Sequence, residues 1–199
     1  MTKYSIVGSG NVGTALARAF ADHAVPVTIA NTRGPESLEG VSGKLGPTVA
    51  PGAICDALEA DVILAAVPFL KMRELGAQLR DWAGKVVVDT TNACLLPTAD
   101  ELLNGRLTTD INADLFNGAE MVKAFNQISA RRLSRRVAPE QGKRVVFIAG
   151  NSPTASATIA DLATQIGFAP VEVGRIDEGG VLIQDRNALT LRDLYELSH

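Results

Sequence analysis

A glycine motif stands between an apolar run and a helical pattern at the start of this chain. The motif is Gly8-Ser9-Gly10-Asn11-Val12-Gly13, preceded by a strand-like stretch over 3–7 that ends in Ile6 and Val7, and followed by a helical pattern over 12–22. In such a strand–turn–helix, Gly8 allows the tight turn, Gly10 lets a pyrophosphate approach the backbone, and Gly13 lets the helix pack on the sheet. The helix N-terminus then directs N–H groups and a positive dipole end at the phosphates. The motif predicts dinucleotide binding, with an unliganded glycine-rich turn as the alternative.

Apolar runs and helical patterns alternate along the rest of the chain. Strands are predicted at residues 3–7, 25–30, 61–67, 85–89, 121–125, 144–149 and 169–173, with a weaker one at 47–50. Helices are predicted at residues 12–22, 35–38, 53–60, 69–83, 129–136, 153–166 and 178–197, whereas residues 90–118 show no clear period. The strand runs are continuous rather than alternating, which is typical of a parallel sheet covered on both faces.

This pattern predicts an α/β fold: a doubly wound, mostly parallel Rossmann sheet with helices on both faces and a short C-terminal helical segment. We expect a single NADP-binding Rossmann domain at residues 1–174. Residues 175–199 are expected to form the C-terminal helical segment, which is not an independent domain.

Composition excludes several classes of protein. Hydrophobic residues make up 46% of the 199 residues and charged residues 21%, so the chain is not expected to be disordered. A net charge of −3 argues against nucleic acid as the main partner. The longest apolar run, residues 62–70, contains Pro68 and is too short to span a membrane.

The small number of cysteines and histidines limits the disulfides and metal sites that the chain can form. Cys55 and Cys94 cannot build a disulfide framework and fit a reducing compartment. The predicted strand at residues 3–7 leaves no room for a signal peptide, so we expect a cytoplasmic protein. With His23 and His199 as its histidines, the chain is not expected to hold a histidine-based metal site.

The residues after the second predicted strand favour NADP over NAD. NAD-binding proteins carry an acidic residue there to hold the ribose 2′-hydroxyl, but this chain has Asn31, Thr32 and Arg33. A missing carboxylate removes repulsion of a 2′-phosphate, and the Arg33 guanidinium offers a fork of donors suited to phosphate. The alternative is that Arg33 is a solvated loop charge.

Polar and apolar residues also follow the later strands, at the edge of the sheet where ligands bind. Candidates for contact with a bound nucleotide or with a second ligand beside it are Val67, Pro68, Phe69, Thr90, Asn92 and Asn126. The alternative for the threonine and the asparagines is local capping, because these side chains often bond the nearby backbone.

Several of these blocks together resemble the coenzyme F-420 (deazaflavin)-dependent NADP oxidoreductases. The resemblance rests on the glycine motif, residues 31–36, and five later blocks: Ala66-Val67-Pro68-Phe69, Val88-Asp89-Thr90-Thr91-Asn92, Val122-Lys123-Ala124-Phe125-Asn126, Phe147-Ile148-Ala149-Gly150 and residues 167–174. The reductase domain of metal-reducing transmembrane proteins is similar in the same blocks. The resemblance implies a homodimeric Rossmann protein that binds NADP(H) and transfers hydride to or from a deazaflavin or a flavin (FMN or FAD).

Hydride transfer is mainly a positioning problem, and the cofactor carries the chemistry. No catalytic residue is therefore expected, and the sequence has neither G-x-S-x-G nor H-E-x-x-H. Lys123 is a candidate acid or a structural ion-pair partner, and Cys94 has the character of a small buried thiol. Two other functions stay open: a non-catalytic NADP(H)-binding redox sensor, and a reductase of a small carbonyl or imine.

A basic run distinguishes the second half of the chain. Residues 131–144 hold Arg131, Arg132, Arg135, Arg136, Lys143 and Arg144 against the single acid Glu140. Such a run is usually a solvated face or a patch paired with carboxylates elsewhere. The sharper hypothesis is a docking site for the anionic tail of the acceptor.

Overall fold

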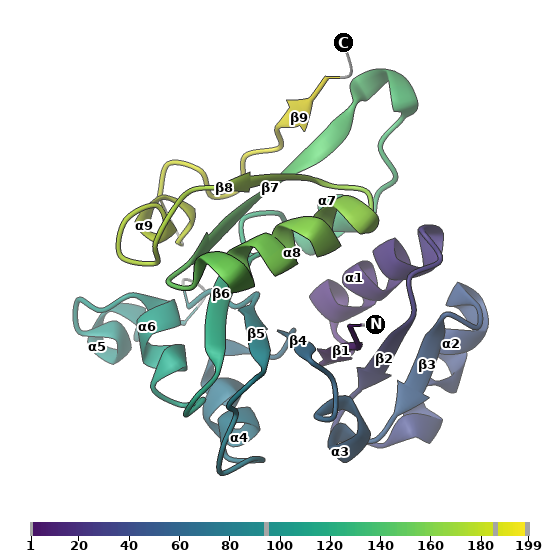
Figure 1. The fold of residues 1–199 in the computed structure, drawn as a ribbon, viewed down its shortest axis with the longest axis horizontal. Coiled ribbons are helices and arrows are strands. Elements are labelled where there is room, and N and C mark those ends of the chain that lie inside the picture. The colour runs from purple at the N-terminus through teal and green to yellow at the C-terminus, as the bar shows by residue number, and fades with distance from the viewer. Residues whose placement is uncertain (1, 94–95, 185–186, 198–199) are drawn as a thin grey trace.

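The computed structural model describes residues 2–93, 96–184 and 187–197. Its strands are β1 (Tyr4–Val7), β2 (Val27–Ala30), β3 (Val49–Gly52), β4 (Val62–Ala65), β5 (Val86–Asp89), β6 (Glu120–Ala124), β7 (Lys143–Gly150), β8 (Ala169–Glu172) and β9 (Tyr195–Glu196). The sheet has the order β3-β2-β1-β4-β5-β6-β7-β8 (Figure 1). Neighbouring strands along this path are parallel except β6 and β7, which are antiparallel. The order of the first six strands is that of the Rossmann fold, so the predicted fold class is confirmed.

Short helices connect most of these strands. They are α1 (Asn11–Asp22), α2 (Glu39–Leu45), α3 (Ile54–Ala57), α4 (Met72–Gly76), α5 (Ala99–Leu103), α6 (Thr108–Ala113), α7 (Ala130–Leu133), α8 (Pro153–Gln165) and α9 (Gly180–Ile183). Three 3-10 turns complete the set: η1 (Pro35–Leu38), η2 (Phe69–Lys71) and η3 (Pro139–Gln141).

Both faces of the sheet are buried, as the continuous apolar runs predicted. Successive strand residues point to opposite faces, so Ile6 joins one core cluster and Val7 the other. The first cluster packs against α1 and α8, and the second packs against α3 and α4. The second contains Trp82 and Phe116, whose rings meet edge to face with centroids 4.7 Å apart.

Several helices differ from the sequence-based expectations. The helix predicted over 69–83 ends at Gly76, because the chain turns so that Trp82 can reach the core and donate to the carbonyl of Gly76 at 2.9 Å. Residues 90–118, which showed no period, contain α5 and α6. Of the helix predicted over 178–197, the described residues form α9 alone, and Tyr195–Glu196 form β9 instead.

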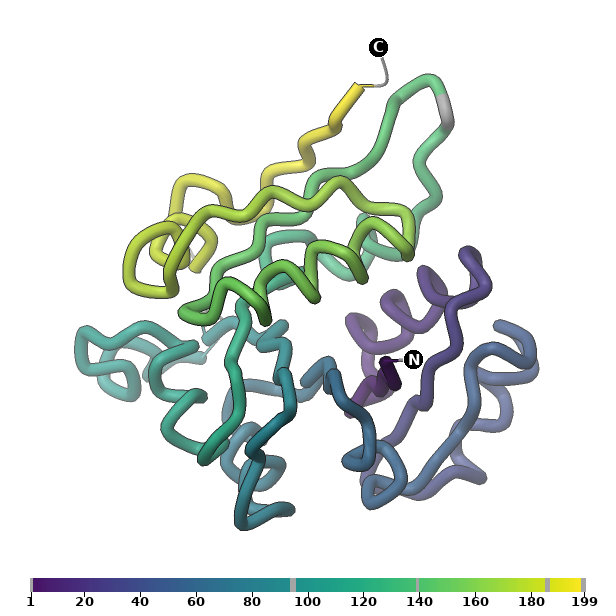
Figure 2. Tube along the Cα trace, viewed as in Figure 1, coloured from purple at the N-terminus to yellow at the C-terminus, as the bar shows by residue number. Residues whose placement is uncertain are grey.

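The C-terminal chain runs back along the sheet. Figure 2 shows it beside the start of β7, where Lys143 and Arg144 pair with Glu196 and Tyr195. Ile183 of α9 packs with Phe147 and Ala149 of β7 in a small third cluster. The contacts of Ile183, Tyr195 and Glu196 therefore attach the C-terminal part of the chain to the sheet.

Candidate functional site

The glycine motif forms the turn between β1 and α1. Gly8 has φ +114°, and a Cβ there would lie 2.2 Å from the carbonyl oxygen of Ala66; a Cβ at Gly13 would lie 1.9 Å from that of Gly8. Packing within the protein therefore requires both glycines. A Cβ at Gly10 would meet nothing within 4 Å. Gly10 is thus the one glycine of the motif whose missing side chain leaves open space.

Gly10 is also the N-cap of α1. No side chain caps this helix end, and its first turn carries no acidic residue. The first N–H groups of a twelve-residue helix consequently face open space with the positive end of the helix dipole. This arrangement is suited to an anion such as a pyrophosphate.

The loop after β2 lies against the glycine motif. The side-chain amide of Asn31 donates to the Ser9 hydroxyl at 2.8 Å and to the Ser37 hydroxyl at 3.0 Å. The backbone N–H of Arg33 donates to the Asn31 side chain at 2.8 Å, and its guanidinium reaches the Ser9 hydroxyl at 3.4 Å. Within the described part of the chain, no carboxylate forms an ion pair with Arg33. Its charge is therefore available to a ligand.

These two loops line a cavity of about 560 Å³, which we call the carboxyl-edge cavity. It lies where the strand order reverses, at the carboxyl ends of β1, β2 and β4, and its volume suits a small-molecule ligand. Eight predicted site residues line it: Gly8, Ser9, Gly10, Asn31, Thr32, Arg33, Val67 and Pro68. The remaining lining residues are Val7, Ile54, Ala66, Lys71, Glu74, Leu75 and Gln78.

The α4 side of this cavity was not predicted. Lys71 and Glu74 form an exposed ion pair of 2.5 Å there, and Gln78 lies one turn further along the chain. No motif distinguishes these residues. The only available signal was their position after β4, where a helix that follows a strand at the switch point borders the ligand crevice.

The other predicted residues do not line the cavity. Asn11, Val12 and Gly13 form the start of α1, and Phe69 lies half-buried in η2. The Thr90 hydroxyl donates to the carbonyl of Ala65, the last residue of the neighbouring strand β4, at 2.9 Å.

Asn92 and Asn126 bind each other. The Asn92 amide donates to the backbone carbonyl of Asn126 at 2.8 Å, and the Asn126 amide donates to the Asn92 side-chain oxygen at 3.0 Å. Asn126 also donates to the carbonyl of Ile183 at 2.7 Å. This pair therefore joins the ends of β5 and β6 to the C-terminal segment, and the buried Oδ1 atom of Asn126 has no hydrogen-bond partner among the described residues.

Lys123 is buried beneath this edge of the sheet. Its Nζ lies 3.1 Å from Oδ2 of Asp89, and both side chains are almost completely buried. Desolvation lowers the pKa of Lys123, and attraction to Asp89 offsets this only in part. Desolvation raises the pKa of Asp89, but Lys123 and hydrogen bonds from Thr91 bring it below its ordinary value. The geometry supports the ion-pair interpretation of Lys123 rather than the acid.

Within the described part of the chain, three of the six basic residues in the run pair with distant carboxylates. Arg136 binds Asp22 at the far end of α1 with two hydrogen bonds of 2.5 and 3.0 Å. Since α1 has twelve residues, Asp22 lies about 18 Å along the helix from its N-terminus. Buried Arg144 donates to Asp193 at 2.8 Å, and Arg132 lies 3.4 Å from the same carboxylate. These pairs favour the structural interpretation over an acceptor dock.

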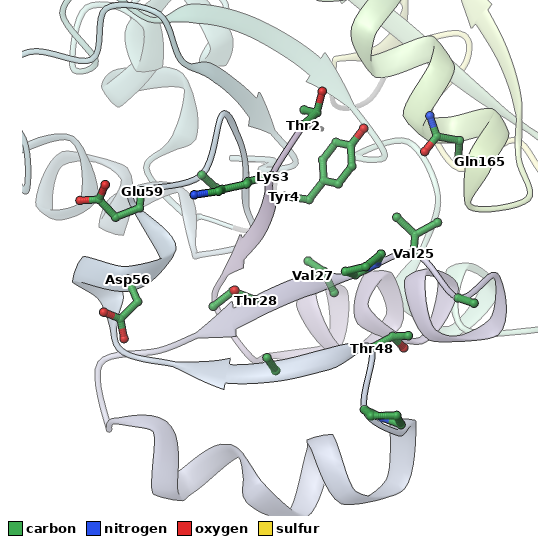
Figure 3. Close-up of a pocket in the computed structure, with 15 residues that line it drawn as sticks. Thr2, Lys3, Tyr4, Val25, Val27, Thr28, Thr48, Asp56, Glu59 and Gln165 are labelled. Atoms are coloured by element: carbon green, nitrogen blue, oxygen red, sulfur yellow. The ribbon is translucent and has the colours of Figure 1, made fainter.

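A second, larger cavity of about 920 Å³ lies at the opposite, amino edge of β1, β2 and β3 (Figure 3). Figure 3 shows Asp56 and Glu59 at one end and Gln165 at the other. In a parallel sheet this edge is remote from the glycine motif, so this cavity is separate from the candidate nucleotide site.

The described residues also bear on metal binding, membrane insertion and thiol chemistry. No cluster of three or more His, Cys, Asp or Glu side chains there has a metal-binding arrangement. None of the helices in that part of the chain has the length and apolarity needed to cross a membrane. Cys55 is a free, exposed thiol, while Cys94 lies outside the described residues.

Comparison with known proteins confirms the resemblance that the sequence blocks indicated. Residues 3–93 match the family described as "NADP oxidoreductase coenzyme F420-dependent". Rat metalloreductase STEAP3 is 31% identical over 175 residues, which cover 87% of this chain and 34% of the rat protein. The chain thus spans about a third of that relative's length.

Two solved structures are similar over most of their length. A hypothetical protein from Sinorhizobium meliloti has 39% identity and a TM-score of 0.93, with 98% of this chain and 96% of that one covered. A protein assigned as an F420-dependent NADP reductase from Arthrobacter sp. FB24 has 26% identity and a TM-score of 0.69, with coverages of 89% and 86%.

Proposed function

We propose, from the match of residues 3–93 to the coenzyme F-420-dependent NADP oxidoreductase family, that the protein exchanges hydride between NADP(H) and a deazaflavin (coenzyme F-420) or a flavin. NADP(H) would bind in the carboxyl-edge cavity. The acceptor would be a small molecule. The protein would work in the cytoplasm as a homodimer, and light scattering tests the dimeric state directly.

The contact between Arg33 and Ser9 carries the proposal. It holds a guanidinium without a carboxylate partner at the junction of the glycine motif and the loop after β2. A dinucleotide whose pyrophosphate meets the N-terminus of α1 extends its adenosine ribose towards this second loop. Arg33 is then available to the 2′-phosphate, and Asn31 is a neutral side chain in place of the carboxylate that would repel it.

The residues around the glycine motif fit the phosphates of NADP(H). The open space at Gly10 admits the pyrophosphate to the uncapped start of α1, where an acidic side chain would oppose it and none is present. Val67 and Pro68 line the same cavity from the end of β4. Pro68 has φ −57° and ψ 145°, so its ring fixes the backbone there and offers a rigid apolar wall.

The protein's part in the reaction is positioning. Bound NADPH supplies the hydride, and the chain must hold the two reacting carbons about 3–3.5 Å apart and exclude water. The rigid turn at Pro68 supplies a fixed wall of the cavity for this purpose, and the linked ends of β5 and β6 would lie beyond it, towards the acceptor. No side chain is needed as a proton donor in this step, which agrees with the role of Lys123 as an ion-pair partner.

Oxidation of NADPH in the presence of deazaflavin, FMN, FAD or ferric chelates, each supplied separately, tests this function. We expect turnover with the deazaflavin or a flavin, and loss of turnover in Gly10→Ala. NADPH binding without oxidation across the panel would contradict the proposal and favour the redox sensor. A small ketone and a cyclic imine are supplied as two further acceptors, and turnover with one of these alone would favour the third function.

A further inference from the structure

An ion pair links two neighbouring strands below the proposed reaction site. Asp89 is the last residue of β5 and pairs in register with Lys123 of β6. Neither side chain lines the carboxyl-edge cavity, and both are at most 1% exposed. Burial of two charges costs free energy that well-packed apolar side chains would not, so stability alone does not explain the pair.

Both charges bind the loop that follows β5. The carboxylate of Asp89 accepts hydrogen bonds from the backbone N–H of Thr91 at 2.8 Å and from its hydroxyl at 2.7 Å. The ammonium of Lys123 donates to the carbonyl of Thr91 at 2.8 Å. The pair therefore fixes every polar atom of Thr91, which lies next to Asn92.

The same two charges also bind α6. Asp89 accepts from the hydroxyl of Thr109 at 2.9 Å and from the amide of Asn112 at 3.1 Å. Lys123 donates to the hydroxyl of Thr108 at 3.0 Å. Since α6 is only six residues long, the pair determines its position against the sheet.

The C-terminal segment is connected to this network at two adjacent residues. The backbone N–H of Thr108 donates to the side-chain oxygen of Gln184 at 2.8 Å. The carbonyl of the preceding Ile183 accepts from Asn126, which is itself bonded to Asn92. Two chains of hydrogen bonds therefore lead from the ion pair region to residues 183–184.

We propose that Asp89 and Lys123 form a positioning pair, which holds the loop 90–92 and residues 183–184 in the arrangement that seats the hydride acceptor beside the nicotinamide. This inference rests on the proposed function. The carboxyl ends of β5 and β6 continue the edge that holds the nucleotide, so the acceptor end of the site lies on their side. A small displacement there costs much rate, because about 1 Å of misplacement can lower a rate roughly a hundredfold.

The test compares Lys123→Met with the double variant Asp89→Asn/Lys123→Met. The single variant leaves a buried carboxylate without a counter-charge, so its melting temperature should fall strongly. The double variant removes both charges and should recover much of that loss. If the pair positions the acceptor, kcat should stay lowered in the double variant by roughly tenfold to a hundredfold, whereas the Kd for NADPH should change by less than about twofold.

A matched control is Ser5→Ala. The hydroxyl of Ser5 is completely buried and donates to the carbonyl of Ala57 at 2.7 Å, away from the network. This variant should lower the melting temperature and leave kcat unchanged. If kcat recovers together with stability in the double variant, the pair is merely structural and the proposal is overturned.

Amide hydrogen exchange separates this inference from the proposed function, because it needs no turnover. In the folded double variant, exchange should accelerate at residues 90–92 and 180–184 and stay unchanged in α1. Unchanged exchange at both segments would overturn the positioning role. Wild-type protein that oxidises no NADPH would contradict the proposed function, while the exchange result would still decide whether the pair holds these segments.

Discussion

The side-chain amide of Asn31 donates a hydrogen bond of 2.8 Å to the hydroxyl of Ser9. Through this contact, the loop after β2 is attached to the glycine motif before any ligand arrives. The guanidinium of Arg33 reaches the same hydroxyl at 3.4 Å. The two segments proposed to recognise phosphate are therefore assembled in advance, which lowers the ordering cost of binding.

Replacement of Arg33 by Ala should weaken NADPH binding and leave NADH binding nearly unchanged. Loss of a charged hydrogen bond to the 2′-phosphate costs about 1.5–3 kcal/mol, or roughly 10- to 150-fold in Kd. Titration calorimetry with both nucleotides measures this difference. The control is Arg175→Ala, which removes an exposed arginine paired with Asp177 outside the cavity. Equal losses for NADPH and NADH in Arg33→Ala would refute the assignment.

Replacement of Asn31 by Asp should reduce the preference for NADPH over NADH by roughly tenfold or more. The new carboxylate would repel the 2′-phosphate and could accept a hydrogen bond from the 2′-hydroxyl of NADH. Competitive titration of the two nucleotides gives the preference directly. Asn104→Asp makes the same charge change at the exposed end of α5 and should not alter it. An unchanged preference in Asn31→Asp would remove this loop from the site.

Replacement of Gly10 by Ala should abolish nucleotide binding without unfolding the protein. Gly10 has φ −74°, which alanine adopts readily, and the added Cβ meets no protein atom within 4 Å. The methyl group would instead occupy the approach of the pyrophosphate, so we expect no saturable NADPH binding at concentrations up to roughly a hundred times the wild-type Kd. Thermal unfolding and NADPH titration on the same sample check both parts.

The control for that variant is Gly43→Ala. Gly43 lies inside α2, and a Cβ there also meets nothing within 4 Å. This change should raise stability by about 0.5–1 kcal/mol and leave NADPH binding intact. Wild-type affinity in Gly10→Ala would show that the phosphates bind elsewhere.

Replacement of Arg136 by Gln should destabilise the protein at neutral pH and have little effect in acid. A hydrogen bond from Arg136 holds the pKa of Asp22 below its ordinary value of 3.8. A carboxyl whose pKa is lower in the folded state contributes stability above pH 3.8, and that contribution disappears as the pH falls through the folded pKa. Melting temperatures of both proteins should therefore converge as the pH is lowered. The control is Arg131→Gln, which removes a neighbouring exposed arginine. A difference in melting temperature between Arg136→Gln and the wild type that persists in acid would contradict the linkage.

Strands and the first turn were predictable because their signals are local. Each apolar run gave a strand within a few residues of its expected place, since strands buried on both faces are continuous apolar runs. The glycine motif likewise gave the turn, because Gly8 and Gly13 are needed by backbone geometry alone. The ends of strands were less predictable: β6 ends before Phe125, which has φ +62°, and no residue type announces that conformation.

Interactions between distant residues were not predictable. The register that sets Asp89 opposite Lys123 depends on the pairing of β5 with β6, which the local pattern does not specify. The same holds for Arg136, whose partner Asp22 precedes it by 114 residues. The α4 wall of the carboxyl-edge cavity also required the fold, because Lys71 and Glu74 become site residues only through the position of their helix.

Anaerobic single-turnover mixing tests the central claim most directly. Protein loaded with NADPH is mixed with one equivalent of deazaflavin or FMN, and the absorbances of the dihydronicotinamide and of the oxidised acceptor are followed together. The account predicts that both decay at the same rate and in equal amounts with at least one acceptor, and that Gly10→Ala shows neither decay. Bound NADPH that persists with both acceptors would contradict hydride transfer to a deazaflavin or flavin.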